Sequence, residues 1–166
     1  ISDMDLWKAG DSLTAEILVA YFPSSHHMRR SAESIAALSG GDLYAIRAIA
    51  PYSERPRSMK REIKAERKEN IFPSLHGALP DLSGYRKIIL GFPLISGRCP
   101  NLVRSFLRQS DLRGKILYPY CITRFRRIGN CNEDLQSECN AYLVLPCRNV
   151  DRMDQSTIRA WLEAGE

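Results

Sequence analysis

The 166-residue sequence lacks any apolar run long enough to cross a bilayer, and no signal-peptide pattern opens it. We therefore expect a cytoplasmic protein with no membrane partner. The sequence also lacks a concentrated basic stripe, because its formal net charge of +5 is spread along the chain. This excess favours anionic partners in general but argues against a nucleic-acid binder.

Closely spaced cysteine pairs are absent as well. The chain has no C-x-x-C pair, and its cysteines are spaced too evenly for a structural zinc site. We therefore expect reduced thiols and no metal site. The five residues are Cys99, Cys121, Cys131, Cys139 and Cys147.

The most informative stretch that is present covers residues 16–33. Residues 17–22 are almost wholly apolar, which is typical of a strand buried on both faces. A turn rich in Pro, Ser and His follows, and from Met28 onward apolar residues recur at helical spacing. A loop that enters a helix N-terminus gathers free backbone N–H groups at the positive end of the helix dipole. The pattern therefore predicts an anion site.

Segments with strand and helix patterns alternate along the rest of the chain. Strands are predicted over residues 42–50, 87–92, 115–121 and 141–145, with a short helix over 133–139 and a last helix capped by Asp154. The alternation, with strands too apolar for a one-sided sheet, predicts a doubly wound α/β sandwich with a parallel sheet. We expect one domain over residues 1–166, with ligands beyond the carboxyl ends of the strands.

Residues 53–70 carry the densest charge of the chain. Seven Lys and Arg residues are interleaved with four Glu residues, and Met59 and Ile63 lie one helical turn apart. We expect a solvated helix with ion pairs between positions i and i+4, because the acidic residues cancel much of the basic charge.

The order and spacing of these segments resemble the flavodoxin family. The matching stretches are residues 17–22, 29–33, 85–93, 97–100, 106–107, 112–115, 128–129 and 158–162. The resemblance implies a three-layer sandwich with a five-stranded parallel sheet of order 2-1-3-4-5 and helices on both faces. It also implies a flavoprotein that binds FMN at the carboxyl edge of the sheet and acts in electron transfer, as a carrier or an oxidoreductase.

In the first loop, the resemblance assigns the FMN phosphate to residues 24–28. Two hydroxyls are present there, but a histidine replaces the family's glycine and a methionine its last threonine. A Cβ hinders close backbone approach, and a methionine donates no hydrogen bond. The candidate residues are Ser24, Ser25, His26, His27 and Met28.

The second and third loops complete the implied FMN site. The family carries two aromatic residues in the second loop, and here Ile95 and Ser96 replace them, which removes a stacking contribution of about 0.5–1.5 kcal/mol. In the third loop, bulky residues replace the family's small ones. The candidates are Pro93, Leu94, Ile95, Ser96 and Gly97, and then Thr123, Arg124, Phe125 and Arg126.

Two hypotheses follow from these departures. In the first, FMN binds through charged donors, which make stronger hydrogen bonds to phosphate, and the protein serves a redox partner protein or a small acceptor. In the second, the fold is a flavin-free binding module for another anionic ligand or a protein partner. A hydrolase or transferase with His26 or His27 as general base is a weaker third, because the sequence places no nucleophile or acidic partner beside them.

Overall fold

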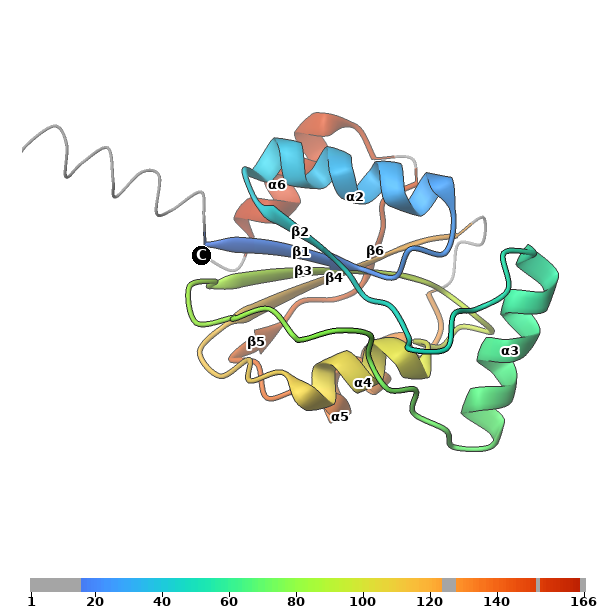
Figure 1. Ribbon diagram of the computed structural model, residues 1–166. Coiled ribbons are helices and arrows are strands. Elements are labelled where there is room, and N and C mark those ends of the chain that lie inside the picture. Colours follow the sequence, from blue (N-terminus) through green and yellow to red (C-terminus); the bar gives the residue numbers. More distant parts are fainter. Residues whose placement is uncertain (1–15, 124–127, 152, 165–166) are drawn as a thin grey trace, which may run out of the picture.

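The computed structural model describes residues 16–123, 128–151 and 153–164, built around a parallel sheet (Figure 1). The strand order is β2-β1-β3-β4-β5, as predicted. The strands are β1 (Ile17–Tyr21), β2 (Asp42–Ala45), β3 (Lys87–Pro93), β4 (Ile116–Ile122), β5 (Leu143–Val144) and β6 (Arg148–Asn149).

Helices cover both faces of the sheet, which confirms the three-layer prediction (Figure 1). One face carries α2 (His26–Ser39) and α6 (Gln155–Glu163), and the other carries α4 (Asn101–Gln109) and α5 (Cys131–Glu138). The remaining helix, α3 (Pro56–Lys68), stands beyond the carboxyl ends of the strands, at the edge where ligands bind in this class of fold.

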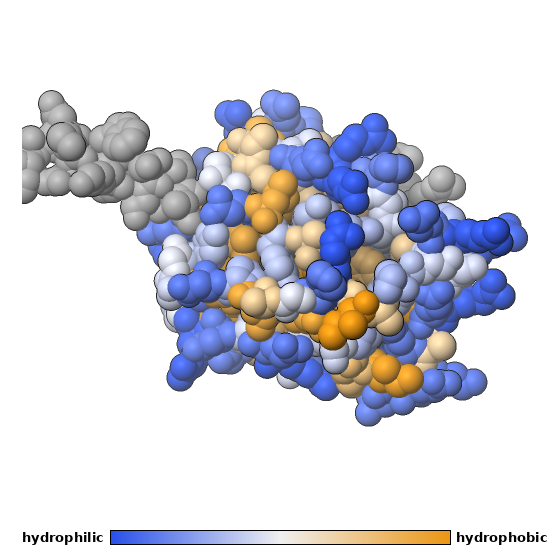
Figure 2. All heavy atoms as spheres, in the orientation of Figure 1, coloured by the Kyte–Doolittle hydropathy of each residue, from blue (hydrophilic) through white to orange (hydrophobic). Residues whose placement is uncertain are grey.

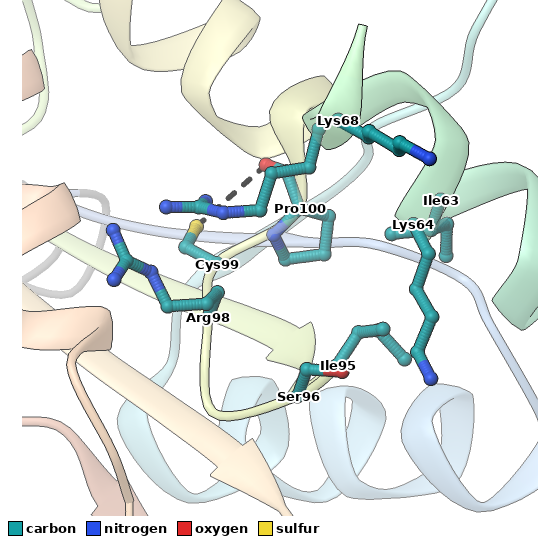
Figure 3. Close-up of a pocket in the computed structure, with 9 residues that line it drawn as sticks. Ile63, Lys64, Lys68, Ile95, Ser96, Arg98, Cys99 and Pro100 are labelled. Carbon is teal, nitrogen blue, oxygen red and sulfur yellow. Dashed lines mark hydrogen bonds between the residues drawn. The ribbon is translucent and has the colours of Figure 1, made fainter. Parts of the chain in front are cut away.

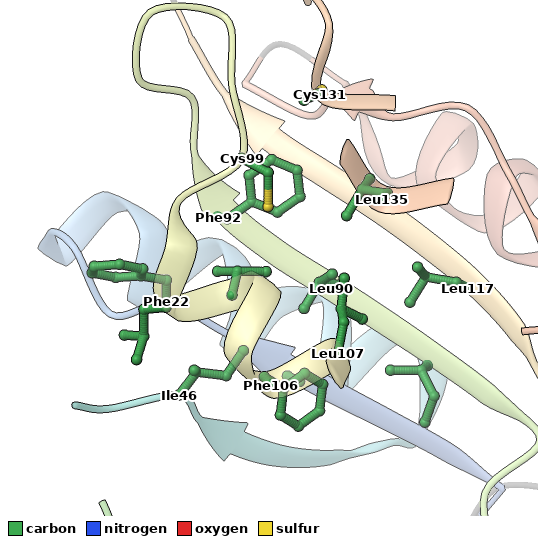
Figure 4. Close-up of a cluster of buried hydrophobic side chains, with 14 of the residues drawn as sticks. Phe22, Ile46, Leu90, Phe92, Cys99, Phe106, Leu107, Leu117, Cys131 and Leu135 are labelled. Carbon is green, nitrogen blue, oxygen red and sulfur yellow. The ribbon is translucent and has the colours of Figure 1, made fainter. Parts of the chain in front are cut away.

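Side chains alternate across the central strands and build one core on each face. Leu18 and Leu90 point toward α4, while Val19 and Ile89 point toward α2. Figure 4 shows the core on the α4 side, where Phe92 and other fully buried residues lie between the sheet and the helices. Each such side chain contributes about 1.5–3 kcal/mol by leaving water.

The fifth strand of the prediction is split into two short strands, and prolines explain the split. Both β5 and β6 pair with β4 in parallel, at Leu117 and at Cys121 respectively. Pro119 lies between these two positions on the same side of β4, and it has no N–H to donate. Pro146 lies in the segment between β5 and β6 and also lacks an N–H. Neither this segment nor β4 can therefore supply every hydrogen bond that a continuous strand would need.

The second strand is shorter than predicted because its continuation changes partner. β2 ends at Ala45 rather than near residue 50. Ala48 then forms an antiparallel bridge with Leu75, in the long connection before β3. Residues 47–49 therefore leave the parallel sheet and pair with residues 74–76 at its carboxyl edge.

Gly91 on β3 lies directly opposite Tyr120 on the neighbouring strand β4. A Cβ at this position would overlap the ring of Tyr120, which is fully buried on β4. We predict that Gly91→Ala lowers the free energy of unfolding by about 1–3 kcal/mol or more, because the ring cannot move aside in a close-packed core.

Chemical denaturation of the two purified variants checks this prediction. Gly84→Ala is the matched control, since a Cβ at Gly84 meets nothing within 4 Å. We expect it to change the free energy of unfolding by less than about 0.5 kcal/mol. Equal effects of the two substitutions on the free energy of unfolding would show that the contact with Tyr120 does not prevent a larger side chain at residue 91.

Candidate functional site

The loop after β1 presents its backbone N–H groups at the start of α2. Ser25 is the N-cap residue, and its Oγ accepts a hydrogen bond from the N–H of Met28 at 3.1 Å. In the described part of the chain, the N–H groups of His26 and His27 meet no protein acceptor. The first turn therefore offers free donors at the positive end of the helix dipole, as the sequence predicts.

A hollow of about 830 Å³ lies beside this turn. Ser24, Ser25 and His26 line it from the first loop, together with Arg29 from the first turn of α2. Its apolar wall comes from Phe22, Ile46, Met59 and Leu102. The hollow thus combines hydroxyl and cationic donors with apolar surface, as small-molecule sites do.

Two further basic side chains reach the hollow from segments distant in sequence. The N–H of His76 donates to the carbonyl of Arg47 at 2.7 Å, within the antiparallel pairing described above. This pairing sets Arg47 and His76 side by side, and both line the hollow. Sequence reasoning missed them, because no pattern near residue 47 predicts that residue 76 lies next to it.

Tyr52 lies in the wall of the hollow and is held in place from α3. Its hydroxyl donates to Glu66 Oε1 at 2.6 Å, and its ring centroid lies 5.4 Å from that of Phe22. Burial, together with the hydrogen bond to Glu66, raises the pKa of Tyr52, so the phenol stays protonated. The N–H of Ser53 donates to Glu62 Oε2 at 3.1 Å, which fixes the connection to α3.

Two predicted residues of the first loop face away from the hollow. His27 Nε2 lies 2.7 Å from Asp151 Oδ1, on the α6 side of α2. Met28 is 1% exposed and packs in the core between α2 and the sheet. Their side chains therefore do not join Ser24, Ser25 and His26, because successive residues of a helix point about 100° apart.

The loop after β3 is closed as a tight hairpin. Ile95 and Arg98 exchange backbone hydrogen bonds, and the two residues between them, Ser96 and Gly97, have φ of 53° and 71°. Positive φ at both central positions is the type I′ turn of two-residue hairpins. Gly129 packs on this turn so closely that a Cβ there would lie 2.6 Å from the carbonyl oxygen of Gly97.

A buried carboxylate of α5 anchors the hairpin. Asp134 accepts from Arg98 Nε at 3.1 Å and from Arg98 Nη2 at 2.8 Å. It also accepts from both terminal nitrogens of Arg67 on α3, at 3.3 and 3.4 Å, and from the N–H of Cys99 at 3.2 Å. The side chain of Asp134 is 6% exposed, so one desolvated anion holds three segments together.

The predicted residues of the second loop border a different cavity from those of the first. Ile95 and Ser96 line a groove of about 250 Å³ between the hairpin and α3 (Figure 3). Leu94 and Ile95 also pack against the core on the α4 side, and Pro93 is half-buried at the end of β3. The structure brings both loops to one edge of the sheet but into two separate hollows.

The third loop lies only partly in the described chain. Thr123 donates its backbone N–H to Asn149 Oδ1 at 3.3 Å, and its carbonyl accepts from Asn149 Nδ2 at 2.8 Å. These bonds tie the end of β4 to β6. The other predicted residues, Arg124, Phe125 and Arg126, lie outside the described residues.

Within the described ranges, no His, Cys, Asp and Glu side chains gather in a group that could hold a metal ion. In the same ranges, no helix has both the length and the apolar character that a membrane span requires. The five cysteines are free, and four of them are buried.

Comparisons with known proteins agree on one family and fold. The family model described as "Flavodoxin" matches residues 16–165. The chain is similar to the crystal structure of a candidate flavoprotein from Bacteroides eggerthii, with 28% identity and a TM-score of 0.74 over 90% of this chain and 96% of the other. It also matches a flavoprotein from Lactobacillus acidophilus in complex with FMN, with 15% identity and a TM-score of 0.71 over 90% and 99%. No curated protein matches the sequence.

We predict that Asp134→Asn lowers the free energy of unfolding by about 2–3 kcal/mol. Removing one partner of a buried ion pair costs about 3–5 kcal/mol, and here Arg67 and Arg98 are each about 30% exposed and can recover part of their hydration. Chemical denaturation measures the effect.

The exposed pair of Asp111 and Arg113 supplies the control, because both side chains are more than half exposed. Asp111→Asn is expected to cost less than about 1 kcal/mol. If Asp134→Asn were as mild as this control, Asp134 would not be the anchor of the hairpin.

Proposed function

Because the chain belongs to the flavodoxin family, we propose that it binds FMN at the carboxyl edge of the sheet and acts in electron transfer. The observation that supports the proposal most directly is the hollow beside the first turn of α2. It joins free N–H groups, two serines and basic side chains at one helix N-terminus.

The donor set of this hollow fits a phosphate dianion. The backbone of His26 and the hydroxyl of Ser24 offer neutral donors, while Arg29 and Arg47 offer guanidinium groups. Hydrogen bonds from charged donors to phosphate are roughly twice as strong as neutral ones. The arginines can therefore compensate for the glycine and threonine that the family carries in this loop.

The same hollow supplies the apolar surface that a ring system needs. Phe22 and Ile46 form buried wall, and Tyr52 adds an aromatic ring held by Glu66. Bound FMN would supply the redox chemistry, while the protein binds, orients and shields it. The Lactobacillus acidophilus protein shares the fold and has been crystallised with FMN. Its structure supports the proposal at the level of the fold.

One observation favours a second candidate function, a flavin-free module that binds another anionic ligand. The second loop has no aromatic residue, and its tight hairpin packs against Gly129. The stacking surface that the family offers to the flavin is therefore missing from this loop. In that case the hollow beside α2 would take a phosphate or carboxylate ligand without a flavin ring.

Titration of protein into FMN, followed by the quenching of flavin fluorescence, tests the proposal. We expect FMN to bind more tightly than riboflavin, which has the same ring but no phosphate. Arg29→Gln and Arg47→Gln should each weaken FMN binding by about tenfold, the value of one charge-assisted hydrogen bond, and leave riboflavin binding unchanged.

Arg159→Gln on α6 is the matched control, since it removes one exposed charge away from the hollow. It should bind FMN as the unchanged protein does. Fluorescence that stays unquenched at every protein concentration would reject FMN and leave the second candidate, for which inorganic phosphate is the probe.

A further inference from the structure

The charges of α3 are sorted onto separate faces of the helix. Its basic residues at positions 57, 60, 61, 64 and 68 are three or four apart, so they share one face. All but one border a single hollow of about 440 Å³, lined by Arg57, Lys60, Arg61 and Lys64. The stripe is not apparent from the charge composition of residues 53–70, because glutamates are interleaved with the basic residues.

The glutamates of α3 do not neutralise this stripe. Glu62 and Glu66 turn to the connection before the helix, where they accept from Ser53 and Tyr52. In the described chain, no ion pair joins a glutamate of α3 to a basic residue of α3. The predicted i,i+4 pairing is therefore wrong, because the acidic side chains have better partners in the folded protein.

The basic stripe continues into the groove beside the hairpin. Lys64 lines both hollows and extends toward Ile95 and Ser96, while Lys68 lies at the opposite end of the groove (Figure 3). The groove is prearranged, because Asp134 binds one arginine from each of its walls, Arg67 and Arg98. Hydrophilic side chains cover most of this end of the molecule (Figure 2).

We propose that this basic groove, formed by the α3 stripe and the Ile95–Arg98 hairpin, is the docking surface for an acidic segment of a partner protein. The amines of Lys60, Lys64 and Lys68 face solvent without an anionic partner in the described chain, which suits carboxylates on another surface. That the partner protein is the one with which this chain exchanges electrons rests on the proposed function.

The chemistry of the groove favours a protein over a nucleic acid. Single-stranded nucleic acids bind on aromatic side chains that stack with the bases. The described residues that line the groove include no aromatic ring; Ile63, Cys99 and Pro100 are buried, and Ile95 is half-buried. The groove therefore offers exposed lysines rather than apolar surface, which suits the carboxylates of an acidic segment.

Fluorescence anisotropy with a labelled polyglutamate peptide tests the proposal on the protein without FMN. The triple variant Lys60→Gln, Lys64→Gln and Lys68→Gln should weaken peptide binding by about tenfold or more, the combined value of three exposed ion pairs. An oligouridylate of equal charge, measured in parallel, should bind more weakly than the peptide.

The matched control removes three exposed arginines that lie elsewhere, Arg113→Gln, Arg148→Gln and Arg159→Gln. It changes the net charge equally and should weaken binding by less than about twofold. Equal loss in both triple variants, or preference for the oligouridylate, would overturn the proposal. Because the assay needs no FMN, a failed flavin titration would leave its result intact.

Discussion

The carboxylate of Asp134 fixes the relative positions of three segments that the rest of the edge depends on. It holds Arg67 of α3, Arg98 of the hairpin and the backbone of Cys99 before α4. A buried anion is costly unless cations and hydrogen-bond donors surround it. Asp134 therefore needs all three contacts, and each of the three segments is held in place by Asp134. With them in place, α3 stands beyond the strands and the hairpin closes against it.

The position of α3 divides the carboxyl edge into two regions with different chemistry. On one side, the hollow beside α2 combines apolar wall with donors for a phosphate. On the other, the basic groove presents lysines above a floor of paired arginines. The first suits a small ligand and the second suits a protein surface, which is the arrangement that the proposed electron carrier would need.

The parts of the fold that sequence predicted are those set by local pattern. The apolar run of β1, the turn and the helix of α2 follow from periodicity, and Asp154 caps α6 as expected, accepting from the N–H of Thr157. The pairing of Arg47 with His76 could not be predicted, because it depends on the antiparallel bridge between distant segments. The split of the fifth strand likewise depends on which side of β4 Pro119 faces.

The sequence by itself determined the α/β class, the strand order through its family resemblance, and the free N–H groups at the start of α2, where it predicts an anion site. It could do so because strand and helix periods and loop composition are local properties. Only the tertiary structure decided that Met28 is buried, that His27 meets Asp151, and that the glutamates of α3 turn away from its lysines. Those outcomes depend on competition among partners from distant segments, which exist only once the chain is folded.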